Sequence, residues 1–191
     1  MAVVALPATA LGQGSELGTI TNLHAPASVI RAATGQSVPL AFKDHVFEGD
    51  RIDTREGSVS VLLGLDSVAT VRPRSSVTFT AANGSRVLTV ASGAVRYSVD
   101  RTRVPSGAVY EVRTPNAIVR LRGTVLLVEF WPLAPVPPGP LTRICVLSGM
   151  VSASTLDGEE IQIGPDGCTF IEDPPPPRLR EAPSRSTIGR Q

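Results

Sequence analysis

The stretch that decides the fold is residues 110–130, which read Tyr-Glu-Val-Arg-Thr-Pro-Asn-Ala-Ile-Val-Arg-Leu-Arg-Gly-Thr-Val-Leu-Leu-Val-Glu-Phe. It holds the densest β-type pattern of the chain, with Arg120 and Arg122 two residues apart inside an apolar run. Because a strand sends alternate side chains to opposite faces, Arg120, Arg122 and Thr124 should share one face. We interpret the stretch as the central strand of a β scaffold.

Short β-type runs separated by turn signals fill the rest of the chain, and helical periodicity is hard to find. The Gly49-Asp50 pair predicts one turn, and Asn83-Gly84 is the strongest hairpin signal because both residues tolerate positive φ. The expected strands in the first half of the chain are residues 18–29, 37–42, 58–65, 68–72, 76–80 and 86–90, and residues 47–54 contain the Gly49-Asp50 turn.

Residues 87–99 resemble residues 143–154, since each segment is a β run, a Ser-Gly pair and a second β run. We expect Gly93 and Gly149 to mark a bulge or a sharp bend. Together these patterns predict an all-β fold, a single domain of short, mostly antiparallel strands. Two arrangements fit the pattern, a two-sheet sandwich and a stacked, β-helix-like structure.

The chain has 191 residues, enough for one domain with a substantial core. Its formal net charge is +1, and its arginines are spread along the chain rather than clustered. This distribution gives no electrostatic footprint for nucleic acid. The sequence carries no signal of oligomeric state.

The two ends differ in composition from the middle. Residues 1–14 are apolar and uncharged, with small residues that fit a cleavage site, so we expect a signal peptide whose true start lies upstream. The alternative is an ordinary apolar N-terminus. Residues 172–191 are rich in proline, arginine and serine and predict a disordered tail. The most apolar run, residues 123–141, holds five prolines and Glu129 and does not suit a membrane helix.

Cys145 and Cys168 are the two cysteines of the chain. In an exported protein such a pair can form a disulfide, and two buried free thiols are the alternative. A zinc site is not expected, because the sequence has neither a CxxC motif nor a nearby pair of histidines.

A search for catalytic or metal-binding patterns finds none that supports an enzyme, and we expect neither a cofactor nor a metal. His24 and His45 are the two histidines, and neither belongs to a ligand motif. No nucleophile elbow and no Gly-rich phosphate loop occurs. The acidic residues between positions 44 and 56 would need to converge to bind calcium, so a solvated turn region is the preferred interpretation.

The two arginines of the opening stretch allow two interpretations. A buried guanidinium needs a carboxylate partner, and Asp50, Asp53 and Asp66 are the candidates. We favour a structural clamp in which Arg122 holds neighbouring turns. Arg120 is then the freer of the two and the better candidate for outside contact.

Residues 131–140 are rich in proline and lie between two predicted strands. We expect a protruding loop in which Trp131 is a candidate contact residue. The alternative is that Trp131 packs against the sheet.

The landmarks of the chain follow an order that resembles the FecR domain of bacterial extracytoplasmic proteins, over about residues 18–171. The most specific element is Thr114-Pro115 followed at fixed spacing by Arg122-Gly123-Thr124. The other landmarks are Gly49-Asp50-Arg51-Ile52-Asp53-Thr54, Asp66-Ser67-Val68, Ser76-Val77, Gly93-Ala94-Val95 and Gly149-Met150-Val151.

The resemblance implies an all-β domain, which in the best-known members is the periplasmic part of an anti-sigma regulator that senses an iron-siderophore receptor. Those members also carry a cytoplasmic anti-sigma segment, a transmembrane helix and a C-terminal receptor-contacting domain, for which we find no matching sequence here. We therefore expect an exported, periplasmic or secreted, non-enzymatic sensor or adaptor that binds another envelope protein. The alternative is a structural module of the envelope, associated with surface polysaccharide.

Overall fold

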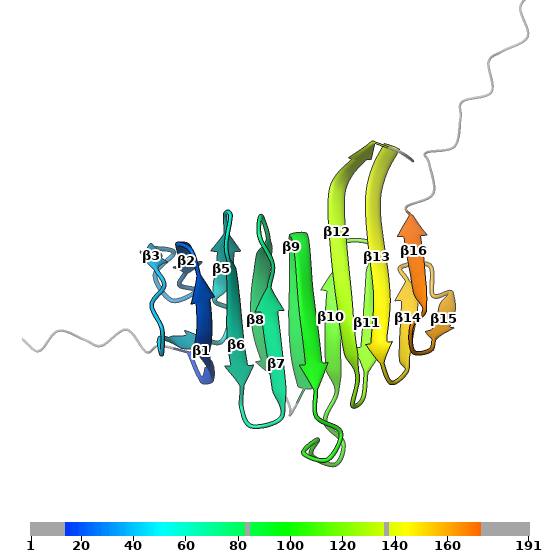
Figure 1. Cartoon of the computed structure of the whole chain (residues 1–191), viewed down its shortest axis with the longest axis horizontal. Helices are drawn as coiled ribbons and strands as arrows, with labels where there is room; N and C mark the ends of the chain where they lie inside the picture. The colour runs from blue at the N-terminus through cyan, green and yellow to red at the C-terminus, as the bar shows by residue number, and fades with distance from the viewer. Residues whose placement is uncertain (1–13, 83–84, 136–137, 173–191) are drawn as a thin grey trace, which may run out of the picture.

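The computed structural model describes residues 14–82, 85–135 and 138–172. These residues form sixteen strands and no helix, which confirms the predicted all-β class. Because no described residue is helical, no helix long and apolar enough to cross a membrane occurs among them. The strands lie side by side in two layers (Figure 1).

The front layer in Figure 1, sheet A, consists of eight strands. In spatial order they are β4 (His45–Phe47), β1 (Glu16–His24), β6 (Ser58–Leu63), β7 (Ser67–Val71), the second half of β9 (Ser85–Val99), β12 (Val125–Pro135), β13 (Pro138–Ser148) and β16 (Cys168–Glu172).

The layer behind it, sheet B, consists of nine strands. In spatial order they are β3 (Ser37–Pro39), β2 (Ala27–Ile30), β5 (Arg51–Thr54), β8 (Ser76–Ala82), the first half of β9, β10 (Tyr110–Thr114), β11 (Ala117–Leu121), β14 (Val151–Thr155) and β15 (Glu160–Ile163).

Strand β9 belongs to both sheets and bends between its two halves. Its first half pairs with β8 and β10, and its second half pairs with β7 and β12. The bend lies at Gly93, whose φ is +79°, and a Cβ there would lie 2.3 Å from Ser75 Oγ. Gly149, with φ +86°, lies where the chain passes from β13 of sheet A to β14 of sheet B. The bend expected at Gly93 within a continuing strand is therefore confirmed, whereas Gly149 lies in a turn between two strands.

The core lies between the two sheets. Strand β6 shows how the sequence builds it, since Val59, Val61 and Leu63 are buried while the residues between them are half-buried. Most neighbouring strands are antiparallel, and β9 with β10 is a parallel pair. Of the two predicted arrangements, the structure has two facing sheets, between which the chain passes repeatedly.

The prediction of one central strand in residues 110–130 is wrong. The stretch forms β10, β11 and the start of β12, with a turn at Pro115-Asn116 and a second at residues 122–124. Strands β10 and β11 lie in sheet B, whereas β12 lies in sheet A. Proline ends the first strand, and Gly123 adopts a positive φ of +71° in the second turn. Arg122 is consequently exposed, whereas Thr124 is buried.

The predicted loop at residues 131–140 is also wrong, because β12 and β13 continue through it as a hairpin. Pairing reaches Pro135 and Pro138, with a register shift between Trp131 and Ala134. Proline is tolerated because strand β9 ends its pairing with β12 at Phe130, so the outer edges of the hairpin need no further backbone donors.

The expected first strand, residues 18–29, is divided at Ala25, whose φ is +64°, into β1 and β2.

The other predictions concern residues that the structure does not describe. The Asn83-Gly84 turn lies outside the described residues, although Ala82 and Ser85 pair on either side of it. The predicted signal peptide at residues 1–14 lies outside them up to residue 13, as does the predicted tail beyond Glu172.

Candidate functional site

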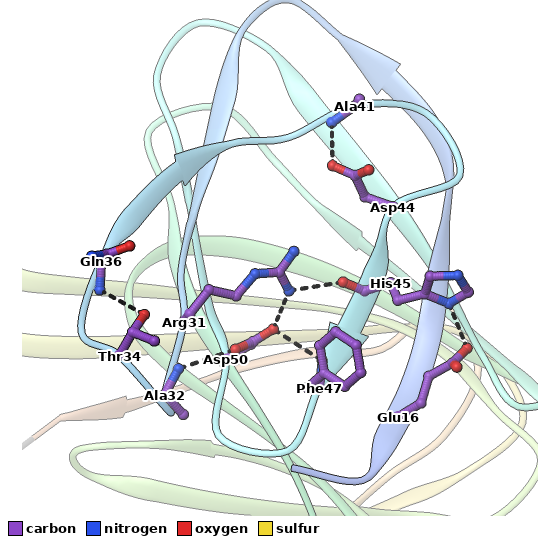
Figure 2. Close-up of polar contacts among 10 residues, drawn as sticks. All are labelled: Glu16, Arg31, Ala32, Thr34, Gln36, Ala41, Asp44, His45, Phe47 and Asp50. Carbon is purple, nitrogen blue, oxygen red and sulfur yellow. Dashed lines mark hydrogen bonds and ion pairs between the residues drawn. The ribbon is translucent and has the colours of Figure 1, made fainter. Parts of the chain in front are cut away.

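The first landmark of the sequence, Gly49-Asp50, forms the turn between β4 and β5 (Figure 2). Asp50 is 2% exposed, and its carboxylate accepts hydrogen bonds from Arg31 Nη1 at 2.6 Å, from Ala32 N at 3.1 Å and from Phe47 N at 3.0 Å. Arg31 Nη1 also donates to the carbonyl oxygen of His45 at 2.8 Å. Asp50 therefore fixes the loop after β2 against the β4–β5 turn.

The second landmark, Asp66, binds groups from three parts of the chain. It is 6% exposed and accepts hydrogen bonds from Arg86 Nη1, from Ser67 Oγ at 3.1 Å and from Tyr110 Oη at 2.6 Å. Arg86 also donates to the carbonyl oxygen of Leu63 at 2.7 Å. The β6–β7 turn of sheet A is thereby joined to β9 and β10 of sheet B.

Both tyrosines of the chain belong to this network, and both are held in the neutral form. Burial and, next, the hydrogen bond to Asp66 together raise the pKa of Tyr110 to about 12. Burial also raises the pKa of Tyr97, whose hydroxyl donates to Ser67 Oγ at 3.3 Å. A phenolate at either position would lie beside the Asp66 carboxylate in a dry interior.

The Thr114-Pro115 landmark lies at the β10–β11 turn and contacts the opposite sheet. The hydroxyls of Thr114 and Thr142 lie 2.8 Å apart, and both bind the side-chain oxygen of Asn116. Asn116 Nδ2 donates to the carbonyl oxygen of Ile171 at 3.0 Å. This buried polar cluster joins sheet B to β13 and β16 of sheet A, so the motif has a structural role here.

The Arg122-Gly123-Thr124 landmark lies at the β11–β12 turn, packed against the β13–β14 turn. Thr124 Oγ1 donates to the carbonyl oxygen of Met150 at 3.1 Å. A Cβ on Gly123 would lie 2.3 Å from Arg101 Cβ, and a Cβ on Gly149 would lie 2.9 Å from the Gly123 carbonyl oxygen. Close backbone approach therefore requires both glycines.

The predicted clamp through Arg122 is wrong. Asp50 pairs with Arg31, and Asp66 pairs with Arg86. Asp53 lies 3.3 Å from Arg51 Nε. Arg122 forms no ion pair with any residue of segments 14–82, 85–135 and 138–172. Each of the three carboxylates therefore pairs with an arginine other than Arg122.

Arg120 is not the freer of the two arginines, as the sequence had suggested. Its Nε lies 3.0 Å from Glu111 Oε1, and Glu111 also pairs with Arg113. Glu111 is the cross-strand neighbour of Arg120 in the β10–β11 pair. One carboxylate therefore serves two arginines on the outer face of sheet B.

The β12–β13 hairpin projects beyond the ends of the neighbouring strands (Figure 1), and it carries exposed apolar side chains. Trp131 is 37% exposed and Leu133 is 88% exposed. The guanidinium of Arg143 lies 5.7 Å from the centroid of the Trp131 ring and pairs with Glu129. At the base of the hairpin, Trp131 lines a cavity of about 580 Å³. We call the exposed part of residues 131–135 the hairpin surface.

Cys145 and Cys168 are joined by a disulfide between the paired strands β13 and β16. The bond fastens β16, the last strand of sheet A, which has one neighbouring strand. Phe170, which follows on β16, is exposed and lies opposite Arg143.

The carboxylates of the acidic stretch bind their own chain rather than a common point. Glu48 accepts from Ala81 N at 2.6 Å, Asp44 accepts from Ala41 N at 2.8 Å, and Asp53 accepts from Ser76 Oγ at 2.7 Å. His45 lies 2.7 Å from Glu16 on the surface. No group of three or more histidine, cysteine or carboxylate side chains placed to hold a metal ion occurs in the described part of the chain.

Several residues that organise these landmarks carry no signal in the sequence. Arg31 and Arg86 neutralise Asp50 and Asp66 from 19 and 20 positions away, and no local pattern selects them from the other arginines. Asn116, which directly follows Thr114-Pro115, could have been identified as a buried turn residue from the preference of asparagine for turns.

Comparison with known proteins points to one family. The family model described as FecR protein matches residues 50–152. Two crystal structures of a candidate anti-sigma factor from Parabacteroides distasonis, at 1.65 Å and 2.50 Å resolution, share the fold with a TM-score of 0.54 and 17% sequence identity. The match covers 64% of this chain and 54% of the solved one, so the chain spans about half the length of those structures. The search of curated proteins found no match.

Proposed function

The chain belongs to the FecR protein family, and from this membership we propose that it is an exported, non-enzymatic sensor or adaptor that binds another protein of the cell envelope. The resemblance to periplasmic domains of anti-sigma regulators supports a regulatory role. The networks around Asp50, Asp66 and Asn116 serve the fold, which leaves the exposed surfaces for recognition.

The single observation that carries the proposal is the hairpin surface. Leu133 is 88% exposed on a strand pair that projects from the sheets, and Trp131 lies beside it with Arg143 against its ring. Exposed aromatic and arginine side chains are enriched where proteins bind one another.

Export is supported by two independent features. Residues 1–14 have the composition of a signal peptide, and Cys145 and Cys168 form a disulfide. Disulfides persist in oxidising compartments and are rare in the reducing cytosol. We place the protein in the periplasm or outside the cell.

Affinity capture from envelope extract tests the proposal. We expect the wild-type chain to recover a discrete protein that Leu133→Glu fails to recover, because a charge replaces the apolar contact. The matched control is Leu156→Glu, since Leu156 is 65% exposed in the β14–β15 turn, outside the hairpin. Equal recovery by all three forms would reject the hairpin surface as the binding site.

A second function, association with anionic envelope polysaccharide, is favoured by one observation. Arg72 and Arg74 line the cavity beside Trp131, an arrangement that can stack a sugar ring and bind its carboxylates. Retention of the wild-type chain on a column of acidic polysaccharide, lost in Arg72→Gln/Arg74→Gln, would support this function. Elution of both forms in the void volume would reject it.

A further inference from the structure

Arg122 is a family landmark whose side chain the fold does not use. Gly123, Thr124 and Gly149 are explained by the close packing of the two turns. The Arg122 guanidinium makes neither a hydrogen bond nor an ion pair within the described segments, and it is exposed. The β11–β12 turn, which holds Arg122, lies at the opposite end of the strands from the tip of the β12–β13 hairpin (Figure 1), and it contacts the loop of residues 100–109 at Arg101.

A groove runs past Arg122 at this end of the molecule. One part, of about 560 Å³, is lined by Arg101, Val104, Arg122 and Met150, together with the two glycines. A second part, of about 490 Å³, shares Arg122 and Met150 and adds Arg120 and Val109. We call both parts together the Arg122 groove.

The Arg122 groove is positively charged. Its lining includes three arginines, at positions 101, 120 and 122, and no aspartate or glutamate. Arg101, like Arg122, forms no ion pair with the described residues. Glu111, which pairs with Arg120, is shared with Arg113 and neutralises one charge of the two.

The backbone holds two of these arginines close together. Gly123 leaves room for the Arg101 side chain, since a Cβ on Gly123 would lie 2.3 Å from Arg101 Cβ. Arg122 directly precedes Gly123. The side chains of Arg101 and Arg122 therefore both leave the backbone where the loop of residues 100–109 contacts the β11–β12 turn. Two arginines arranged in this way can bind a carboxylate through charge-assisted hydrogen bonds.

Apolar side chains complete the groove. Met150 is 61% exposed and Val109 is 39% exposed. Methionine adapts its shape to different apolar partners. The groove therefore offers charge at one part and an adaptable apolar surface at the next.

We propose that the Arg122 groove binds an acidic, partly apolar peptide segment of a protein partner. A carboxylate of that segment lies between Arg101 and Arg122, and its apolar residue packs on Met150. The inference rests on the proposed function only in taking a protein as the ligand, because the groove and the hairpin surface are separate sites.

Fluorescence anisotropy with a labelled peptide of alternating aspartate and leucine tests the groove on the purified chain. We expect saturable binding that Arg101→Gln/Arg122→Gln weakens at least tenfold. The control Arg55→Gln/Arg96→Gln removes the same charge from exposed positions outside the groove and should weaken binding less than threefold. Arg122→Lys should lie between them, since lysine keeps the charge but not the bidentate geometry.

Three results would contradict the proposal that the Arg122 groove binds such a peptide. They are no saturable binding, equal weakening by both double variants, and displacement of the peptide by millimolar phosphate or acetate, which would identify a small-anion site. Thermal unfolding of each variant confirms that it is folded, and the exposed arginines make loss of folding an unexpected outcome. Capture of a partner through the hairpin surface remains measurable when the peptide fails to bind, so the two proposals fail separately.

Discussion

Asp66 shows at the scale of single residues how the two sheets are held together. Its carboxylate receives Arg86 from β9 and Tyr110 from β10 and is almost completely buried. A buried carboxylate is stabilising only while its partners are present, because an uncompensated charge in the interior is costly. Replacing Asp66 with a neutral residue therefore leaves Arg86 without its counter-charge, which destabilises the fold.

We predict that Asp66→Asn lowers the free energy of unfolding by about 2–3 kcal/mol, because Arg86 loses its counter-charge and one of the two oxygens that accept from Arg86 and Tyr110 becomes an amide donor. The melting temperature should fall by roughly 5–10 °C. Glu16→Gln is the control, since the Glu16–His45 pair is half-exposed and should contribute at most about 1 kcal/mol. Equal melting temperatures for the two variants would contradict the account.

The two tyrosines give a spectroscopic prediction. The pKa of Tyr110 is raised to about 12 and that of Tyr97 is also raised, so the folded state keeps both protons above pH 10, where unfolded tyrosines lose theirs. Their contribution to stability is complete below pH 10 and is lost as the pH rises towards 12. Absorbance of tyrosinate at about 295 nm should stay near zero in the folded chain at pH 10 and rise there in guanidinium chloride. Ionisation of one or both tyrosines near pH 10 in the folded chain would refute the network.

At the scale of the element, the bend of β9 lets one strand serve both sheets. Comparing Gly93→Ala with Gly107→Ala separates the cost of a positive φ from the cost of a steric clash. Both glycines have a φ of +79°, but they differ in surrounding space. A Cβ at Gly93 would meet Ser75 Oγ at 2.3 Å, whereas nothing lies within 4 Å at Gly107. We predict that Gly93→Ala costs at least about 2 kcal/mol more than Gly107→Ala in chemical denaturation. Similar costs at the two positions would mean that the bend is not tightly packed.

The disulfide that fastens β16 should contribute about 3 kcal/mol, from the 23-residue separation of its cysteines. The variant Cys145→Ser/Cys168→Ser should therefore melt roughly 6–12 °C lower than the wild type. A reductant should lower the melting temperature of the wild type to the same value and leave the variant unchanged. Titration of two free thiols in the purified oxidised protein would contradict the bond.

How much of the fold the sequence predicts also depends on the element. The Val/Leu-rich run of residues 58–65 identifies β6, and Gly49-Asp50 identifies the turn between β4 and β5, because both signals are local. The division of residues 110–130 was missed because the strand pattern on either side outweighed Pro115 and Asn116, the two turn residues that separate β10 from β11.

The candidate sites were less predictable than the strands. The sequence singled out Arg122 but assigned it the wrong role, since pairing of Asp66 with Arg86 depends on which strands become neighbours. Trp131 was identified as a contact candidate, yet its position on a long hairpin follows from pairing across Pro135 and Pro138, which proline normally argues against.

At the scale of the whole molecule, the chain presents different chemistry at its two ends. One end carries the apolar hairpin surface, and the other carries the positively charged Arg122 groove (Figure 1). The buried polar networks between them fix the sheets relative to each other. Two separate surfaces of this kind suit the proposed adaptor role.

The most direct test of the central claim is photocrosslinking in the cells that produce the protein. A photoreactive p-benzoylphenylalanine replaces Leu133 on the hairpin surface, and in a matched strain it replaces Leu156, which is also exposed. We predict one discrete protein adduct from position 133 that position 156 does not give. Absence of any protein adduct at position 133, or the same set of adducts from both positions, would contradict the account.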